Sequence, residues 1–267
     1  QALAGRFSHV VMDEKAHPSL KDAAQILGGR TINFRHLDPA GLKRVVSKLP
    51  KTAGVILLTD GMFSHNGSIA PLRQYMKVLP SNAMLLLDDA HGAGTLGNSG
   101  KGTIELENVP RKRVIQSITL SKAFGCYGGA ILCDAGLRQA IISKSRLFVG
   151  STPLPLPLAG AAFTAVQTLA KEKALRQRLN DNVSFVKERL RESGFEMADS
   201  PSPILAIAPK SSREVDEIRA ACLRHKVFPS FIKYPGGPEN GFFRFVLSSE
   251  HSRAQLEALM ASVTRSF

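Results

Sequence analysis

Short apolar runs alternate with helix-length segments along the first half of this 267-residue chain, and this alternation restricts the possible folds more than any other feature. β-Strands that are separated by helices of this length form a mainly parallel sheet in an α/β architecture. Polar residues flank the runs only at their ends, which is typical of strands covered on both faces. We predict strands at His9–Asp13, Thr31–Arg35, Gly54–Leu58, Ala83–Asp88, Val114–Thr119 and Gly128–Cys133. The intervening helices are predicted at Ser19–Leu27, Pro39–Leu49 and Ile69–Leu79.

The pattern changes after Pro157. Residues 158–190 carry Ala, Leu and Val at helical spacing among many charged residues, and they predict one long helix. Shorter elements follow: strands at Ile204–Ala208, Val227–Ile232 and Phe242–Leu247, helices at Ser212–His225 and Ser252–Val263, and a turn at Pro235–Pro238. We therefore predict a large α/β domain over residues 1–170 and a small α+β domain over residues 171–267.

Composition restricts the possible partners. The formal net charge of +13 raises the question of nucleic-acid binding. The basic residues are spread along the chain without an interleaved aromatic motif, so we expect a solvated basic face that attracts anionic substrates such as a phosphate or coenzyme A. No apolar stretch is long enough to span a bilayer, and three cysteines are too few for a disulfide framework or a zinc site. We expect a cytoplasmic protein with no metal site, membrane span or nucleic-acid partner.

Polar residues of particular chemical types follow four of the predicted strands, at Asp13–His17, Thr59–Ser64, Asp88–His91 and Thr119–Lys122. In an open α/β sheet, ligands bind at the edge where the carboxyl ends of parallel strands meet. Lys122 can form an imine with an aldehyde, and Asp88 can hold a pyridine nitrogen protonated. These are two groups that a pyridoxal phosphate (PLP) enzyme needs, so the sequence predicts a PLP site at this edge.

The segment after the fourth predicted strand carries a longer signature. From Asp88 to Gly102 it reads DDAHGAGTLGNSGKG, which resembles the D-D-A-H-G-x-G-x-x-G-x-x-G-x-G motif of the α-oxoamine synthases. The similarity extends over nearly the whole chain, and a T-x-x-K motif follows at Thr119. The resemblance implies a fold-type I PLP enzyme, with the fold of aspartate aminotransferase, that condenses an amino acid with an acyl-CoA.

The same resemblance assigns roles to individual residues. Lys122 matches the lysine that forms the imine, and Asp88 matches the aspartate that pairs with the pyridine nitrogen. His91 and Ser64 match a histidine and a serine beside the phenolic oxygen of the cofactor. Thr119 matches the threonine that binds the cofactor phosphate.

His17 matches the histidine that stacks on the pyridine ring, and it joins Lys122, Asp88 and His91 as a candidate catalytic residue. Its alternative role is a cap before the helix that follows. Ser151 and Thr152 match a segment that reaches the phosphate site of a partner subunit, which would require a homodimer. Their alternative role is a cap at the entry of the next helix.

Arg244 matches the arginine that binds the substrate carboxylate. A planar guanidinium suits this task because it can donate two parallel hydrogen bonds to one carboxylate. Phe242 stands where the family usually has the first arginine of an R-x-R pair, and Ser64–Gly67 reads SHNG where the family tends to read SMDG. These departures leave the identity of the substrates open.

Family members also have a glycine-rich N-terminal segment before the first strand seen here. We therefore expect an N-terminally truncated chain with weakened PLP binding or activity. One alternative function is a PLP-dependent aminotransferase of the same fold, which the glycine signature argues against. Another is a catalytically silent partner subunit, which the lysine of the T-x-x-K motif argues against.

Overall fold

A computed structural model of the chain describes residues 1–233 and 238–264. The predicted turn Pro235–Pro238 therefore lies, except for its last residue, outside the described residues. The chain forms two compact units. The first contains residues 1–63 and 69–171, and the second contains residues 64–68 and 172–267.

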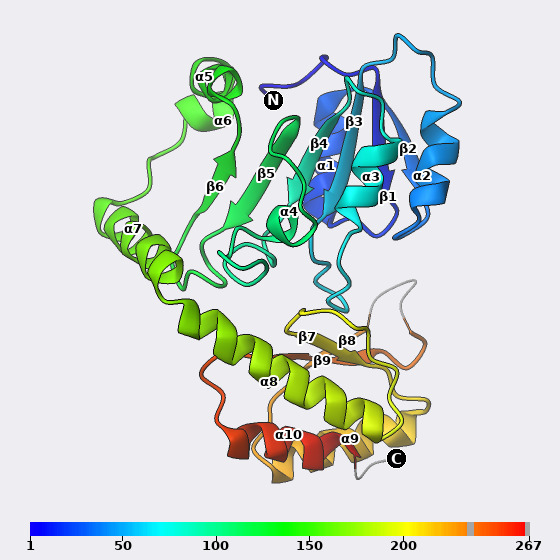
Figure 1. The fold of residues 1–267 in the computed structure, drawn as a ribbon, viewed down its shortest axis with the longest axis vertical. Helices are drawn as coiled ribbons and strands as arrows, with labels where there is room; N and C mark the ends of the chain where they lie inside the picture. Colours follow the sequence, from blue (N-terminus) through cyan, green and yellow to red (C-terminus); the bar gives the residue numbers. More distant parts are fainter. Residues whose placement is uncertain (234–237, 265–267) are drawn as a thin grey trace. The chain divides into compact units, whose positions relative to one another are not determined.

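The first unit is built on a six-stranded sheet in the order β2-β1-β3-β4-β5-β6 (Figure 1). Its strands are β1 (His9–Asp13), β2 (Arg30–Phe34), β3 (Val55–Asp60), β4 (Met84–Asp88), β5 (Val114–Thr119) and β6 (Gly129–Leu132). The first five are parallel, and β6 is antiparallel to β5. The prediction of a mainly parallel α/β sheet is confirmed.

Helices cover both faces of this sheet. The helices of the first unit are α1 (Pro18–Leu27), α2 (Pro39–Val46), α3 (Leu72–Val78), α4 (Thr103–Leu106), α5 (Ala135–Lys144), α6 (Arg146–Val149) and α7 (Leu156–Lys171). Strand β3 shows the two-sided burial most clearly, because all six of its residues are buried. Leu57 packs in the cluster that contains Tyr75 of α3. Ile56 and Leu58 pack in a second cluster with Leu20 of α1. Successive strand residues thus enter opposite cores, which explains the unbroken apolar run.

Strand β6 and the two helices after it differ from this buried pattern. All four residues of β6 are exposed. Only Leu137 is buried in α5, and no residue is buried in α6. The sequence analysis did not predict these helices, because a helix with little buried surface lacks the apolar stripe by which helices are recognised.

The second unit packs helices against a three-stranded antiparallel sheet in the order β7-β9-β8. Its elements are α8 (Lys173–Glu192), β7 (Ile204–Ile207), α9 (Ser212–Arg224), β8 (Ser230–Ile232), β9 (Phe242–Val246) and α10 (Arg253–Thr264). The core joins Val186 of α8, Ile218 of α9, Phe243 of β9 and Val263 of α10.

The single long helix predicted over residues 158–190 is wrong. Helix α7 ends at Lys171 and α8 begins at Lys173, because the backbone at Glu172 leaves the helical conformation, with φ −84° and ψ 73°. The apolar spacing continues on both sides of the break, and no Gly or Pro marks it. This break coincides with the boundary between the two units.

The short segment Ser64–Ser68 belongs to the second unit, which the sequence does not reveal. Gly67 accounts for its close approach to the start of β7. A Cβ at Gly67 would lie 2.2 Å from Ser202 Oγ and 2.5 Å from the Ile204 carbonyl oxygen, and its φ is +72°. Only glycine meets both conditions without strain.

Among residues 1–233 and 238–264, no helix combines the length and the apolar character needed to cross a membrane.

Lys187 of α8 makes the stability of the chain depend on pH. Its side chain is buried, and Nζ donates to the carbonyl and hydroxyl oxygens of Ser200. Burial lowers the pKa of Lys187 to about 8, the positive charge of Arg191 acts in the same direction, and Asp199 opposes them. Folding therefore disfavours the charged form. This penalty is fully present below pH 8 and is relieved as the pH rises through 8 towards the unfolded value near 10.5.

We predict that the wild-type chain gains about 1 kcal/mol of stability relative to Lys187→Met between pH 7 and pH 9.5, after allowance for solvent screening. Urea unfolding at the two pH values measures this difference. Lys173→Met, at the exposed start of α8, is the matched control and should show no such change. Equal pH dependence in wild type and Lys187→Met would contradict the assignment.

Candidate active site

The parallel register places acidic residues side by side at the carboxyl ends of three strands. Asp60 at the end of β3 lies opposite Asp88 at the end of β4, and Asp88 lies opposite Ser117 of β5. Asp13 ends β1, which is the other neighbour of β3. These residues therefore share the edge of the sheet at which the sequence predicts a site.

Lys122 reaches this edge from the turn after β5. Its Nζ lies 2.9 Å from Nε2 of His91, a residue of the segment that follows β4. The turn is closed by Thr119, whose Oγ1 lies 2.8 Å from the Ser121 hydroxyl and donates to the Gly128 carbonyl at 3.3 Å. The structure thus brings Lys122 to His91, which lies 31 residues earlier in the segment that follows Asp88.

Asp88 and Asp89 are adjacent but have different surroundings. Asp88 is half-buried, and its Oδ1 accepts from the Ala90 amide at 3.1 Å. Asp89 is fully buried and accepts three kinds of donor: the Thr103 amide at 2.8 Å, the Thr103 hydroxyl at 2.7 Å and the Gln116 side-chain amide at 2.7 Å. Asp88 remains near the surface of the site, whereas Asp89 ties the loop to the sheet.

The glycines of the signature allow the loop to close on Asp89. A Cβ at Gly102 would lie 2.0 Å from Asp89 Oδ2, and one at Gly92 would lie 2.1 Å from Oδ1. Gly102 also has φ +88°. Burial raises the pKa of Asp89, and the hydrogen bonds from Thr103 and Gln116 act against this shift.

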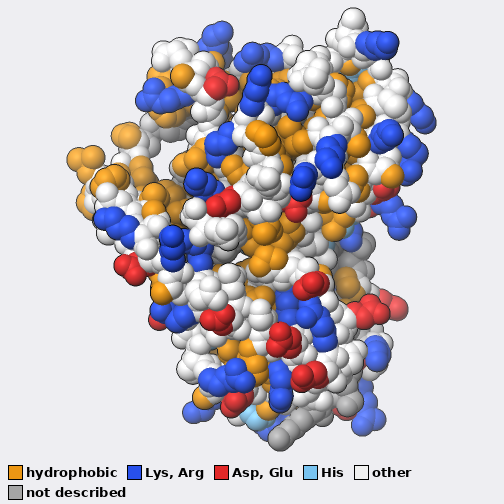
Figure 2. Space-filling model, viewed as in Figure 1, with side chains coloured by type: hydrophobic (Ala, Val, Ile, Leu, Met, Phe, Trp, Pro, Cys, Tyr) orange, Lys and Arg blue, Asp and Glu red, His pale blue; other side chains and the backbone are white. Residues whose placement is uncertain are grey.

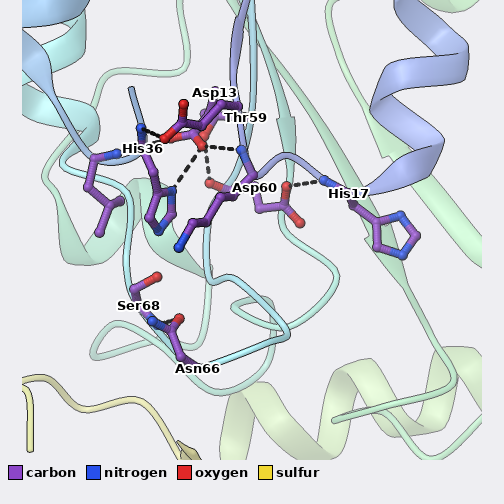
Figure 3. Close-up of polar contacts among 10 residues, drawn as sticks. Asp13, His17, His36, Thr59, Asp60, Asn66 and Ser68 are labelled. Carbon is purple, nitrogen blue, oxygen red and sulfur yellow. Dashed lines mark hydrogen bonds and ion pairs between the residues drawn. The ribbon is translucent and has the colours of Figure 1, made fainter. Parts of the chain in front are cut away.

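His17 lies on the first turn after β1 and is anchored from β3. Its backbone N–H donates to Asp60 Oδ2 at 2.9 Å, and Figure 3 shows its imidazole pointing away from that carboxylate. The ring is exposed, and Nδ1 accepts from the Ser19 amide at 3.2 Å as the N-cap of α1. The capping role is therefore present in the structure, and the ring-stacking role stays a prediction.

Asp13 is fully buried and lies near the hydrogen bond between His17 and Asp60 (Figure 3). Its Oδ1 accepts from the Lys15 amide and lies 2.9 Å from His36 Nδ1, and its Oδ2 accepts from the Leu37 amide at 3.2 Å. Sequence reasoning missed this link to the segment after β2. An isolated aspartate and an isolated histidine 23 residues apart carry no motif.

Ser151 and Thr152 are both exposed in the segment between α6 and α7. The Ser151 hydroxyl donates to the Leu147 carbonyl at the end of α6. Helix α7 begins only at Leu156, so neither residue caps it. Their predicted role at a partner's phosphate site stays a prediction.

Ser64 and Arg244 lie together in the second unit. Arg244 Nη1 donates to the Ser64 carbonyl at 3.2 Å, and the guanidinium is half-buried on β9. Its buried Nε has no hydrogen-bond partner among the residues that the structure describes. A buried N–H donor without a partner is costly, so this arginine retains capacity for an anion.

Comparison with known proteins settles the family. The family described as aminotransferase class I and II matches residues 1–263. The chain belongs to this family. Curated relatives include the 8-amino-7-oxononanoate synthase of Trichlorobacter lovleyi, 31% identical over 268 residues, and that of Xylella fastidiosa, 35% identical over 263 residues. The alignments cover 99% and 96% of this chain but 68% and 64% of those proteins, so the chain spans about two thirds of their length.

Solved structures agree with this aminotransferase class I and II membership. Serine palmitoyltransferase of Sphingomonas wittichii superposes with a TM-score of 0.91 at 26% identity, covering 99% of this chain and 67% of that one. A structure of SPT with a PLP internal aldimine gives a TM-score of 0.91 at 25% identity, covering 99% and 68%. These relatives confirm that the chain resembles the PLP-dependent α-oxoamine synthases. They also confirm the predicted fold-type I architecture.

We predict that Asp89→Ala unfolds more easily than wild type by about 2–4 kcal/mol, because it leaves buried donors of Thr103 and Gln116 unsatisfied. Urea denaturation of the chain measures the loss. Asp22→Ala, an exposed substitution on α1, is the control and should stay within about 0.5 kcal/mol of wild type. A loss below 1 kcal/mol for Asp89→Ala would show that this network does not stabilise the loop.

Proposed function

We propose that this chain carries the PLP site of an enzyme that condenses an amino acid with an acyl-CoA. The observation that supports this most directly is the 2.9 Å contact between Lys122 Nζ and His91 Nε2 beside Asp88. Because the chain spans about two thirds of its curated relatives, the activity is proposed for the whole protein.

The residues present fit the cofactor. PLP requires an accessible lysine, a carboxylate for its pyridine nitrogen and donors for its phosphate. Lys122 is exposed, Asp88 is half-buried on the adjacent strand end, and Thr119 supplies a hydroxyl on the same turn as the lysine. His91 would contact the phenolic oxygen, and His17 would stack on the ring. When bound, PLP supplies an aldehyde for imine formation and an electron-withdrawing ring.

The protein groups then have separate tasks. The Asp88 carboxylate keeps a proton on the pyridine nitrogen by charge pairing. The amine of Lys122, once released by the substrate amine, removes the proton from the substrate Cα, and His91 holds that amine in place. The new carbon–carbon bond forms at the thioester carbonyl while its carbon–sulfur bond breaks and the CoA thiol leaves. In the second unit, we propose Arg244 and Ser64 as groups for the substrate carboxylate and the cofactor oxygen.

Acyl transfer is favoured over amino transfer by the names of the relatives. Serine palmitoyltransferase, by its name, transfers a palmitoyl group to serine. The chain also retains the lysine that a silent partner subunit does not need.

We further propose that the protein is a cytoplasmic homodimer. The exposed apolar side chains between residues 147 and 166 include Phe148, Val149, Leu156 and Phe163. Figure 2 shows hydrophobic side chains over α7 and the segment before it. Large apolar side chains that are exposed close together in the sequence favour an association site. Cys126, Cys133 and Cys222 are free, which suits a reducing compartment.

Lys122→Ala tests the proposed function. With PLP added, the wild-type chain should show an imine absorbance band, and borohydride should fix an adduct that peptide mapping places on Lys122. The variant should lose both, because it removes the amine that lies 2.9 Å from His91 Nε2. Lys77→Ala, an exposed lysine of α3, should keep both signals. A band retained by Lys122→Ala would contradict the assignment.

A further inference from the structure

Asp60 is the acidic residue of this site that the proposed reaction leaves without a task. It ends β3, its exposed fraction is 5%, and its Oδ2 accepts the backbone N–H of His17 at 2.9 Å (Figure 3). The two residues are 43 positions apart, so this bond is a tertiary contact between β3 and the turn before α1.

The hydrogen bonding of Asp60 differs from that of the structural aspartates around it. Asp13 and Asp89 are fully buried, and three polar groups contact the carboxylate of each. The Asp60 side chain makes one hydrogen bond to another residue within the part of the chain that the structure describes, and that bond goes to His17. A buried carboxylate with a single donor is costly to ionise. Fold stability alone does not account for a carboxylate at this position.

The bond acts on a residue whose side chain faces solvent. His17 has an exposed imidazole, and its Nδ1 is held locally by Ser19. The position of the ring therefore depends on the backbone to which it is attached. Asp60 fixes that backbone from the neighbouring strand, next to Asp88 in the register.

We infer that Asp60 is a positioning residue: its carboxylate anchors the backbone of His17 and so sets the imidazole in place for the cofactor ring. This inference rests on the proposed function for the role of His17. An ionised acceptor makes a stronger bond to an N–H than a neutral one, so the anchor is tightest when Asp60 is charged.

The surroundings of Asp60 place its titration in the physiological range. Burial raises the pKa of Asp60 to about 7, the His17 N–H acts against this shift, and the charges of Asp88 on β4 and Asp13 on β1 add to it. From the turn before α1, the titratable residue next to Asp60 is His17 itself. As the pH rises from 6 to 8, Asp60 gains its charge and the anchor strengthens.

The first test needs no cofactor. The chain has seven histidines, so labelling with ¹⁵N-histidine gives at most seven backbone amide signals, and loss of one in His17→Gln identifies the His17 amide. In the wild type this signal should move with an inflection near pH 7. Asp60→Asn should remove the part of this movement that Asp60 causes, and Asp60→Glu should restore it. Asp22→Asn, on the exposed side of α1, should leave it unchanged.

The second test measures PLP affinity by absorbance at pH 6 and pH 8. Wild type and Asp60→Asn should bind alike at pH 6, whereas the wild type should bind up to about tenfold more tightly at pH 8, because only its anchor becomes charged. Urea unfolding should show Asp60→Asn to be as stable as wild type or more stable, since a buried charge is removed.

Two results would overturn the inference. One is a His17 amide titration that is the same in Asp60→Asn as in the wild type. The other concerns both stability and binding. If Asp60→Asn is less stable than wild type, and the ratio of its PLP affinity to that of wild type is the same at pH 6 and pH 8, the role of Asp60 is purely structural. If no variant and no wild-type chain binds PLP, the proposed function fails for this chain, and the amide titration still decides whether Asp60 controls His17.

Discussion

The parallel register of the central strands is the constraint on which the site depends, because it gathers carboxylates at one edge of the sheet. Asp60 and Asp88 are register partners, and Asp13 ends the next strand. Like charges placed this close repel one another unless hydrogen-bond donors compensate. The compensation comes mainly from backbone N–H groups in the turns that leave the strands, such as those of Lys15 and Ala90. The turns therefore stabilise the acids and also present the chemically active side chains.

Asp88 and Asp89, at the end of β4, are adjacent residues with different tasks. Because side chains alternate along a strand, neighbours at its end enter different surroundings. Asp88 stays half-buried at the site, and Asp89 becomes the buried centre on which the glycine-rich loop closes. The glycines of the signature are thus explained by close packing against a carboxylate. His91, which meets Lys122, is held by a loop that Asp89 supports.

The sequence predicts the sheet well because continuous apolar runs and helix-length spacers are strong local signals. The predicted strands at His9–Asp13 and Val114–Thr119 match the structure residue for residue. The shared edge of Asp88 and Lys122 also follows from topology, since carboxyl ends of parallel strands meet there. The anchor between Asp60 and His17 could not be predicted, because an acceptor for a backbone N–H leaves no pattern of residue types. The break at Glu172 was missed because no Gly or Pro marks it, and helix α5 was missed because it buries only Leu137 and so lacks an apolar stripe.

The two edges of the large sheet present different chemistry to their surroundings. Strand β2 begins at the exposed Arg30 and is followed by the exposed Arg35, and positive charge at an edge discourages pairing with another strand. Strand β6 ends the sheet on the other side with Ile131 and Leu132 exposed. Its outer row of backbone groups can act as a template for a further extended segment. In concentrated solution, self-association of the chain through edge-to-edge pairing should therefore begin at β6, and a charged side chain there would suppress it.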